Sequence, residues 1–282
     1  MAKERGVTIR SVPFDTRTGE LLWDRLEQAV TNKTKVLAIG AASNALGTIS
    51  PVREAVQLAH SKGALCFVDA VHYAAHVVID VKAMDCDFLV CSPYKFYGPH
   101  TGVLYGRAEV MEELDVPKLD PASNAIPERM ETGTQNHEGI VGAGAAVDFL
   151  ASLSSGSSRR ERLVGGMTAL HAHGEVLLSR LWEGLSSING AQCFGPPTGR
   201  PRTPTVSFAV DGIPSAEMAK SLAREGIFAS NGNFYATTVV EQLGYAREGL
   251  MRAGCACYTT EEEVDRLIEA VKRARGKISG TA

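Results

Sequence analysis

The residue in this sequence that most clearly suggests chemistry is a lysine with unusual neighbours. Lys95 lies in the segment SPYKFYGP (residues 92–99), among two tyrosines, a phenylalanine and two prolines. Neighbours of this kind remove water from an amine, and desolvation lowers the pKa of a lysine because it disfavours the charged form. We therefore expect Lys95 to be partly desolvated and suited to forming a Schiff base.

Two oxygen-bearing side chains stand in comparable positions. Asp69 ends the apolar run LCFVD, where a carboxylate could pair with the protonated ring nitrogen of a cofactor. Taken alone, an aspartate at this position favours the other interpretation, a cap for the turn that follows. Ser92 follows the run DFLVC, where its hydroxyl suits a phosphate or can cap the turn. The residues alone leave both alternatives open.

Strands and helices alternate in the first half of the chain. Continuous apolar runs such as 64–68 are typical of parallel strands covered on both faces. A helix is expected after Ser50, which can cap it, with Pro51 in its first turn and Gly63 at its end. The expected strands are 7–12, 35–39, 64–68, 87–91 and 103–105, with a short helix at 21–30. This order predicts an open α/β sheet, whose ligands bind beyond the carboxyl ends of the strands, where Asn44, Asp69 and Lys95 lie.

The second half has a different pattern, which predicts a smaller α+β domain. A polar segment at 152–158 is followed by a long helical pattern at 160–188. Strands are expected at 205–210 and near 252–258, and Thr260 with Glu263 forms a capping box for a last helix. We predict a large domain of residues 1–160 and a small one of residues 161–282.

Composition narrows the function. The chain has 282 residues and a formal net charge of −3, which gives no electrostatic footprint for nucleic acid or an anionic membrane. No apolar run reaches the length of a membrane span, and residues 1–10 lack a signal-peptide pattern, so we expect a cytoplasmic protein. The six cysteines form no Cys-x-x-Cys pair, which favours buried reduced thiols over disulfides or a metal site, although Cys255 and Cys257 leave a metal pair open.

The segment VDAVHYAAHVVIDVKAMDCDFLVCSPYKFYGPHTGVLYGR (68–107) resembles the cofactor-lysine signature of class V aminotransferases and cysteine desulfurases. The resemblance implies the fold of type I enzymes that use pyridoxal 5′-phosphate (PLP), with a partial, mostly parallel sheet in the large domain. It implies that Lys95 forms the internal aldimine, that Asp69 pairs with the ring nitrogen and that Ser92 contacts the phosphate. His72 would stand near the phenolic oxygen, a role that rests on its position alone.

Three further motifs extend the resemblance. SNALG (43–47) resembles the family's Ser-Asn-x-x-Gly loop, which implies that Asn44 lies beside cofactor and substrate. ETGTQN (131–136) resembles a Gly-Thr loop donated to the other subunit, which implies a homodimer with shared active sites and a phosphate contact from Thr134. MRA (251–253), followed by YTTEEEVD (258–265), resembles the family segment whose arginine binds the substrate carboxylate. The resemblance implies this role for Arg252, and the alternative for the residue by itself is a surface arginine on a strand.

Two departures from the family pattern bear on the reaction. Tyr235, in SNGNFYA (230–236), stands where a desulfurase carries its nucleophilic cysteine, and a phenol cannot carry a persulfide. The match begins near Val7, without the family segment that supplies a phosphate-cradling loop and a ring-stacking aromatic. We expect that this leaves a sheet edge and apolar surface in need of cover.

The leading hypothesis is a PLP-dependent enzyme, a transferase or lyase, that acts at the α-carbon of a small amino acid. The alternative is a catalytically impaired or partner-dependent truncated homologue that retains the PLP motifs. A nicotinamide-dependent oxidoreductase is set aside because no Gly-x-Gly-x-x-Gly follows a strand.

Overall fold

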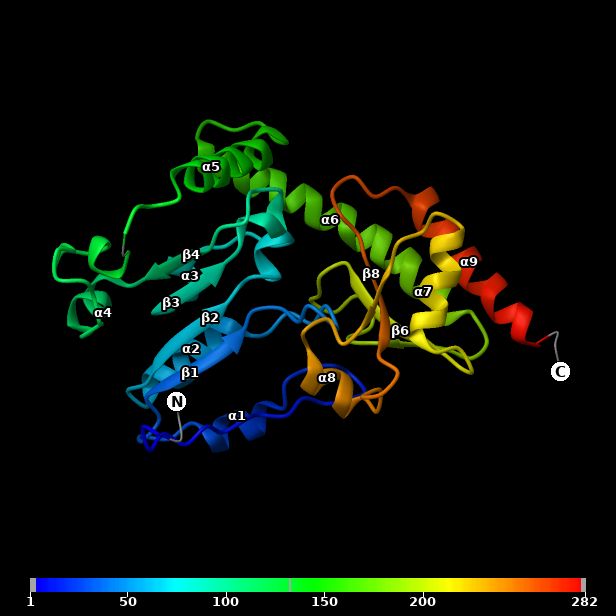
Figure 1. Cartoon of the computed structure of the whole chain (residues 1–282), viewed down its shortest axis with the longest axis horizontal. Helices are drawn as coiled ribbons and strands as arrows, with labels where there is room; N and C mark the ends of the chain where they lie inside the picture. Colours follow the sequence, from blue (N-terminus) through cyan, green and yellow to red (C-terminus); the bar gives the residue numbers. More distant parts are fainter. Residues whose placement is uncertain (1–3, 132, 280–282) are drawn as a thin grey trace. The chain divides into compact units, whose positions relative to one another are not determined.

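The computed structural model describes residues 4–131 and 133–279, which form two compact units (Figure 1). The parallel unit consists of residues 30–41 and 51–169, and the antiparallel unit of residues 1–29, 42–50 and 170–282. This grouping differs from the predicted domains, because two early segments join the C-terminal half and the later boundary falls inside the helix α6 (Arg159–Ser186) rather than at residue 160.

The parallel unit is built on a four-stranded sheet in the order β1-β2-β3-β4. Its strands are β1 (Val36–Gly40), β2 (Leu65–Asp69), β3 (Phe88–Cys91) and β4 (Val103–Gly106). The first three pair in parallel, as the α/β pattern predicts. The apolar run at 103–105 also suggested a parallel strand, and this expectation is wrong, because β4 runs antiparallel to β3. The strand expected at 7–12 is wrong: Val7 and Ile9 are 58% and 76% exposed, and no neighbouring strand completes their backbone hydrogen bonds.

One face of this sheet is covered by α2 (Val52–Ser61), whose Val56 and Ala59 are fully buried. The helix begins after Pro51 rather than at Ser50, and no side chain caps it, so the predicted serine cap is wrong. Gly63, at φ 71°, lies just past the C-terminus as expected. The remaining elements of this unit are η1 (Tyr73–Ala75), α3 (Val81–Met84), η2 (Pro93–Phe96), α4 (Ala108–Glu113), η3 (Glu128–Met130) and α5 (His137–Ser152).

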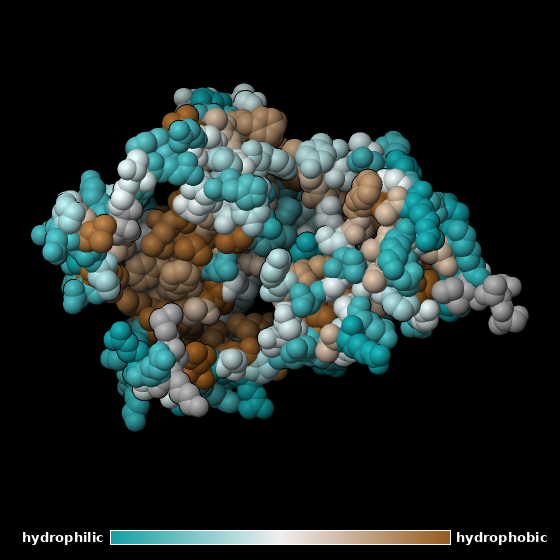
Figure 2. Space-filling model, viewed as in Figure 1, coloured by the Kyte–Doolittle hydropathy of each residue, from teal (hydrophilic) through white to brown (hydrophobic). Residues whose placement is uncertain are grey.

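The opposite face of the sheet is apolar and, among the described residues, less completely covered than the sequence pattern predicted: Phe67 and Phe88 are half-buried. Figure 2 shows hydrophobic residues gathered over β2, β3 and β4. Phe67 and Phe88, neighbours across β2 and β3, have ring centroids 6.1 Å apart, and Val36 and Leu104 on the edge strands are exposed. The apolar runs of these strands therefore arise because both faces of the sheet are apolar, and α2 covers one of the two faces.

The antiparallel unit is an α+β arrangement with a sheet in the order β5-β6-β8-β7. Its strands are β5 (Ala191–Phe194), β6 (Thr205–Val210), β7 (Ser230–Gly232) and β8 (Leu250–Gly254), and its helices are α1 (Trp23–Ala29), the C-terminal part of α6, α7 (Ser215–Arg224), α8 (Thr237–Gln242) and α9 (Glu261–Ser279). The predicted capping box is present: the Glu263 carboxylate accepts from the Thr260 amide at 3.0 Å, and the Thr260 hydroxyl accepts from the Glu263 amide at 3.3 Å.

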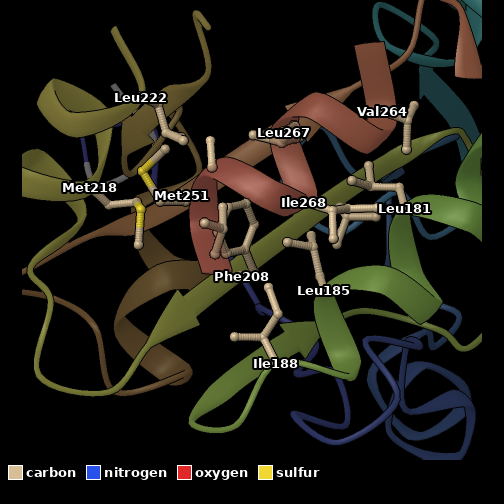
Figure 3. Packing of buried hydrophobic residues seen from close by; sticks show 14 of the residues in the cluster. Leu181, Leu185, Ile188, Phe208, Met218, Leu222, Met251, Val264, Leu267 and Ile268 are labelled. Carbon is tan, nitrogen blue, oxygen red and sulfur yellow. The ribbon is translucent and has the colours of Figure 1, made fainter. Parts of the chain in front are cut away.

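The core of the antiparallel unit lies between its helices and β6 (Figure 3). Leu181 and Leu185 of α6 meet Phe208 of β6 and Ile268 of α9 in one buried cluster. A side chain at Gly184 would place its Cβ 2.2 Å from a methyl carbon of Ile268, so the close approach of α6 and α9 requires glycine there. Within residues 4–131 and 133–279, no helix is both long and apolar enough to span a bilayer.

Candidate active site

Several predicted site residues of the parallel unit leave the sheet at one edge. Asp69 is the last residue of β2, paired in register with Val90, and Ser92 directly follows β3. The amide of Ala70 donates to the carbonyl of Val90 at 2.8 Å, so the two strands stay joined to that point. Parallel strands bring their carboxyl ends to the same edge, and Lys95 follows three residues after Ser92.

Asp69 uses one carboxylate oxygen locally and leaves the other accessible. Its Oδ1 accepts a hydrogen bond from the Val71 amide at 2.9 Å, which is the turn-capping role left open by the sequence. No residue that the structure describes donates to Oδ2, and the residue is exposed. The cap and a second role as partner of a ring nitrogen are therefore compatible.

Ser92 directly precedes η2, and His72 directly precedes η1. These two short 3₁₀ turns pack against each other. The Ser92 side chain makes no capping hydrogen bond, so the turn does not use its hydroxyl. The His72 ring meets the His76 ring edge-on, with centroids 5.0 Å apart. The hydroxyl of Ser92 is therefore available to bind a ligand at this edge of the sheet.

Lys95 is exposed, and the expectation that it is partly desolvated is wrong. Its ammonium nitrogen lies 4.9 Å from the centroid of the Tyr94 ring, and that ring stacks on His100 at 4.8 Å. Pro93 and Phe96 are buried instead, because successive residues of a tight turn point to different sides. Among the residues that the structure describes, the Tyr94 ring is therefore the one that lies against the amine.

The turn that carries Lys95 is held firmly in place. Tyr97 ends it in a left-handed conformation at φ 71°, and its ring meets Phe149 of α5 edge-on at 5.9 Å. A side chain at Gly98 would place its Cβ 2.8 Å from the Cβ of Pro93. The sequence KFYG therefore closes one specific turn and fixes where the lysine leaves the backbone.

In the antiparallel unit, the structure brings Asn44 and Arg252 together through Phe234. Nη1 of Arg252, in β8, donates to the carbonyl of Asn44 at 2.9 Å. Nδ2 of Asn44 donates to the carbonyl of Phe234 at 2.7 Å. The central carbon of the guanidinium lies 4.6 Å from the centroid of the Phe234 ring. These three residues form what we call the arginine clamp.

The charge of Arg252 has no carboxylate beside it among the described residues. Burial lowers the pKa of Arg252 from its ordinary value, and no neighbouring charge acts on it. The side chain is only half-buried, so one edge of the guanidinium remains open. A partly desolvated cation without a counter-ion is a ready site for an anionic group such as a substrate carboxylate.

The loop that presents Asn44 is anchored to the sheet of the same unit. The Ser207 hydroxyl of β6 donates to the carbonyl of Ala45 at 2.6 Å. Gly47, at φ 75°, approaches the backbone so closely that a Cβ there would lie 2.7 Å from the carbonyl oxygen of Thr205. The Asn44 backbone is thus held where the Arg252 guanidinium can reach it.

The structure departs from the predicted site at two residues, Thr134 and Phe234. Thr134 is exposed in a bend before α5, and among the described residues it makes no hydrogen bond to another predicted site residue. Phe234 was not predicted to belong to the site, because a phenylalanine in a polar loop carries no periodic signal. Its left-handed backbone, at φ 56°, is visible only in three dimensions.

A lysine, an aspartate and a serine lie at or just beyond the carboxyl ends of the parallel strands. This is the edge at which α/β proteins with an open sheet bind their ligands. The sequence profile of the class V aminotransferases matches residues 1–267, and the chain belongs to this family. Enzymes of this family depend on PLP. The fold is that of the type I PLP enzymes, as expected from the sequence.

Relatives and solved structures agree with this assignment. The chain is 31% identical to a cysteine desulfurase of Synechococcus elongatus over 97% of its own length and 43% of the relative's. It is 29% identical to a cysteine desulfurase of Dickeya dadantii, over 97% of its own length and 65% of that protein. It therefore spans between about two-fifths and two-thirds of these relatives.

Two solved structures are similar to nearly the whole chain. The apo cysteine desulfurase of Thermococcus onnurineus NA1 matches with a TM-score of 0.85 and 27% identity, over 98% of this chain and 68% of that one. The cysteine desulfurase CsdA of Escherichia coli matches with a TM-score of 0.82 and 27% identity, over 97% of this chain and 67% of that one. The fold of the chain is thus that of cysteine desulfurases.

The residues at the edge of the parallel sheet fit PLP chemically. The cofactor needs a primary amine, a carboxylate for its ring nitrogen and donors for its phosphate. Lys95 offers an exposed amine, Asp69 an unused carboxylate oxygen and Ser92 an unused hydroxyl.

Proposed function

We propose that this chain carries a PLP-dependent transferase or lyase activity at the α-carbon of a small amino acid, with Lys95 as the residue that binds the cofactor covalently. The observation that carries the proposal is the shared sheet edge. Asp69 closes β2, and the turn that carries Lys95 starts where the parallel-paired β3 ends. A carboxylate and an amine at adjacent strand ends match the two main requirements of the cofactor.

Each residue of the edge has one role in the proposal. Asp69 holds the ring nitrogen protonated through Oδ2 while Oδ1 stays on the Val71 amide. Ser92 donates to the phosphate, and His72 lies near the phenolic oxygen. When bound, the cofactor supplies an electron sink for a bond at the α-carbon. The Lys95 amine, when not bound to the cofactor, would carry the proton to or from that carbon.

The substrate-binding part of the proposal rests on the arginine clamp. The open guanidinium edge of Arg252 binds the carboxylate of the amino acid, since a half-buried cation without a counter-ion gains most from an anionic ligand. Asn44 contributes through its backbone carbonyl, which accepts from Nη1 of Arg252, and through the position of its loop. Both residues thereby orient the substrate.

The relatives are named cysteine desulfurases, which suggests that cysteine is the substrate and that its sulfur is transferred to the protein. Tyr235 argues against it, since this residue occupies the place expected for the sulfur-accepting thiol. Tyr235 is fully exposed, as a residue at the tip of that loop would be. Cys255, in the same unit, is buried, and burial raises its pKa to about 11, which keeps it an unreactive neutral thiol at neutral pH. We therefore propose a reaction other than desulfuration through a protein persulfide.

The proposal includes a cytoplasmic homodimer with shared active sites. Thr134 would reach the phosphate of the partner subunit, and its exposure on a bend is compatible with this. The six cysteines are all free, in keeping with a reducing compartment.

Covalent labelling tests the assignment of Lys95. The protein is incubated with PLP, reduced with borohydride and mapped by peptide mass spectrometry, with Lys82 (exposed, in α3) as a control lysine in the same unit. The label should fall on Lys95 and disappear in Lys95→Ala. A label elsewhere, together with normal cofactor retention in Lys95→Ala, would show the assignment to be wrong.

The exposed amine favours a second candidate, an impaired or partner-dependent homologue that retains the PLP motifs. An exposed amine has few neighbours to hold a bound cofactor in place, which is what an impaired homologue would show. The absorbance of purified protein titrated with PLP separates the two candidates. A saturable visible chromophore that borohydride bleaches supports the enzyme, whereas its absence at excess PLP supports the impaired homologue.

A further inference from the structure

We infer that Phe234 is a positioning residue that holds the Arg252 guanidinium in the plane required for carboxylate binding. The inference rests on the proposed role of Arg252 and adds a determinant of specificity that the family resemblance does not supply. In this inference Phe234 acts through the arginine, whose guanidinium its ring contacts.

Two contacts fix the guanidinium, one on its face and one at Nη1, and a third joins the two residues that make them. The Phe234 ring lies under its face, with 4.6 Å between the ring centroid and the guanidinium carbon. The carbonyl of Asn44 takes one N–H of Nη1 at 2.9 Å. The Asn44 amide in turn donates to the carbonyl of Phe234 at 2.7 Å, so the two residues that hold the arginine also hold each other.

This arrangement leaves one edge of the guanidinium for a ligand. A guanidinium has five N–H donors in a single plane, and a ring against its face consumes none of them. One donor is used by Asn44, and no described residue accepts from Nε or Nη2. A carboxylate binds an arginine through two parallel N–H groups, which requires that plane to be held at one angle.

The backbone indicates that the ring is held there against a conformational preference. Phe234 and Tyr235 are consecutive non-glycine residues in the left-handed region, at φ 56° and 60°. Such conformations persist only where surrounding contacts enforce them, and they gather at ligand clamps. Here Asn233 also contributes: its Oδ1 accepts from the Tyr235 amide at 3.2 Å, and its carbonyl accepts from the Ala236 amide at 2.7 Å.

A purely structural role for Phe234 would leave a different signature. The ring also packs beside a buried cluster that includes Leu46, Val240 and Leu250, so its truncation will lower stability in either case. Lower stability affects all ligands equally. A positioning role instead affects only ligands that carry a carboxylate, which makes carboxylate discrimination the informative quantity.

The experiment compares two probes with the PLP-loaded protein: L-alanine, and ethylamine, which is alanine without its carboxylate. Apparent dissociation constants come from the absorbance of the bound cofactor, and their ratio measures carboxylate discrimination. Phe234→Leu should reduce this ratio about three- to tenfold, the range of a partly desolvated cation–ring contact. Phe234→Tyr, which keeps the ring, should retain it. Phe228→Leu makes the same change at a phenylalanine that is 89% exposed and should leave the ratio unchanged.

Arg252→Ala separates failure of the inference from failure of the proposed function. If Arg252→Ala leaves the ratio at the wild-type value, the proposed role of the arginine is wrong. If Arg252→Ala abolishes discrimination but Phe234→Leu does not change it, the arginine binds the carboxylate and only the positioning role of Phe234 is overturned. Loss of discrimination in both Phe234→Leu and Phe228→Leu would also overturn it.

A second measurement needs no cofactor. In nuclear magnetic resonance spectra of the protein without PLP, the Nε–H signal of Arg252 should be shifted by the ring current of Phe234 and should move to its usual position in Phe234→Leu. Propionate should perturb the signal at lower concentration in the wild type than in Phe234→Leu. An Nε–H signal that Phe234→Leu leaves in place would overturn the inference.

Discussion

Asp87 is expected to be one of the most sensitive single positions for the stability of the parallel unit. It directly precedes β3, and its side chain is 4% exposed. Its Oδ2 accepts from the buried amide of Cys66 in β2 at 2.7 Å and lies 2.9 Å from Nε2 of His60 in α2. Its Oδ1 lies 3.2 Å from Nε of Arg107. One carboxylate therefore joins β2, α2 and the residue after β4.

The magnitude follows from burial. A hydrogen bond to a charged group contributes ~1.5–3 kcal/mol, and removal of one member of a buried ion pair costs ~3–5 kcal/mol. Asp87→Asn keeps the shape and one acceptor oxygen, so we expect a loss of about 2–4 kcal/mol in the free energy of unfolding. Asp85→Asn is the matched control. That carboxylate pairs with the same arginine at 2.7 Å but is 60% exposed, so its loss should be below about 1 kcal/mol.

Urea unfolding followed by circular dichroism measures the two variants side by side. Because two units can unfold separately, native-state hydrogen exchange of the Cys66 amide supplies a local value for the parallel unit. The Asp87→Asn protein should exchange that amide faster than Asp85→Asn does. Equal unfolding free energies for the two variants, within about 0.5 kcal/mol, would refute the reasoning that burial decides the strength of this network.

Four further predictions concern the site and the cysteines. Asp69→Asn should retain the Val71 cap and fold normally while losing most activity, measured as turnover against unfolding free energy; wild-type turnover would exclude the ring-nitrogen role. Mixed Lys95→Ala and Thr134→Ala subunits should recover activity through a heterodimer with one intact site, whereas a fully active monomer would contradict sharing. Wild-type protein with excess PLP should form alanine from cysteine more slowly than Tyr235→Cys; rapid formation that alkylation of one cysteine abolishes would locate a different nucleophile. Burial raises the pKa of Cys66 to about 12, so above pH ~8.5 the unfolded thiol loses its proton while the folded thiol keeps it. The free energy of unfolding should therefore fall by about 1.4 kcal/mol for each pH unit, until about pH 12. Cys66→Ala should flatten that slope in urea unfolding between pH 8.5 and 10.5, and an unchanged slope would contradict the assignment.

The elements of the parallel unit could be predicted closely because their signals are local. Apolar runs gave the three parallel strands within two residues of their observed bounds, and Gly63 marked the end of α2. The strand expected at 7–12 failed because alternation alone does not provide a pairing neighbour. The capping box of Thr260 and Glu263 was predictable because both partners lie within one helical turn.

The sequence by itself determined the family and the order of the chemical groups along the chain, since both are carried by contiguous residues such as the segment around Lys95. Tertiary structure decided what those groups touch. It left Lys95 exposed where its neighbours suggested burial, because Phe96 turns inward while Lys95 turns outward. It also joined Asn44 to Arg252 across 208 positions of sequence through a phenylalanine in a left-handed turn. Contacts of that kind depend on how the chain packs, and no local pattern of residue types encodes them.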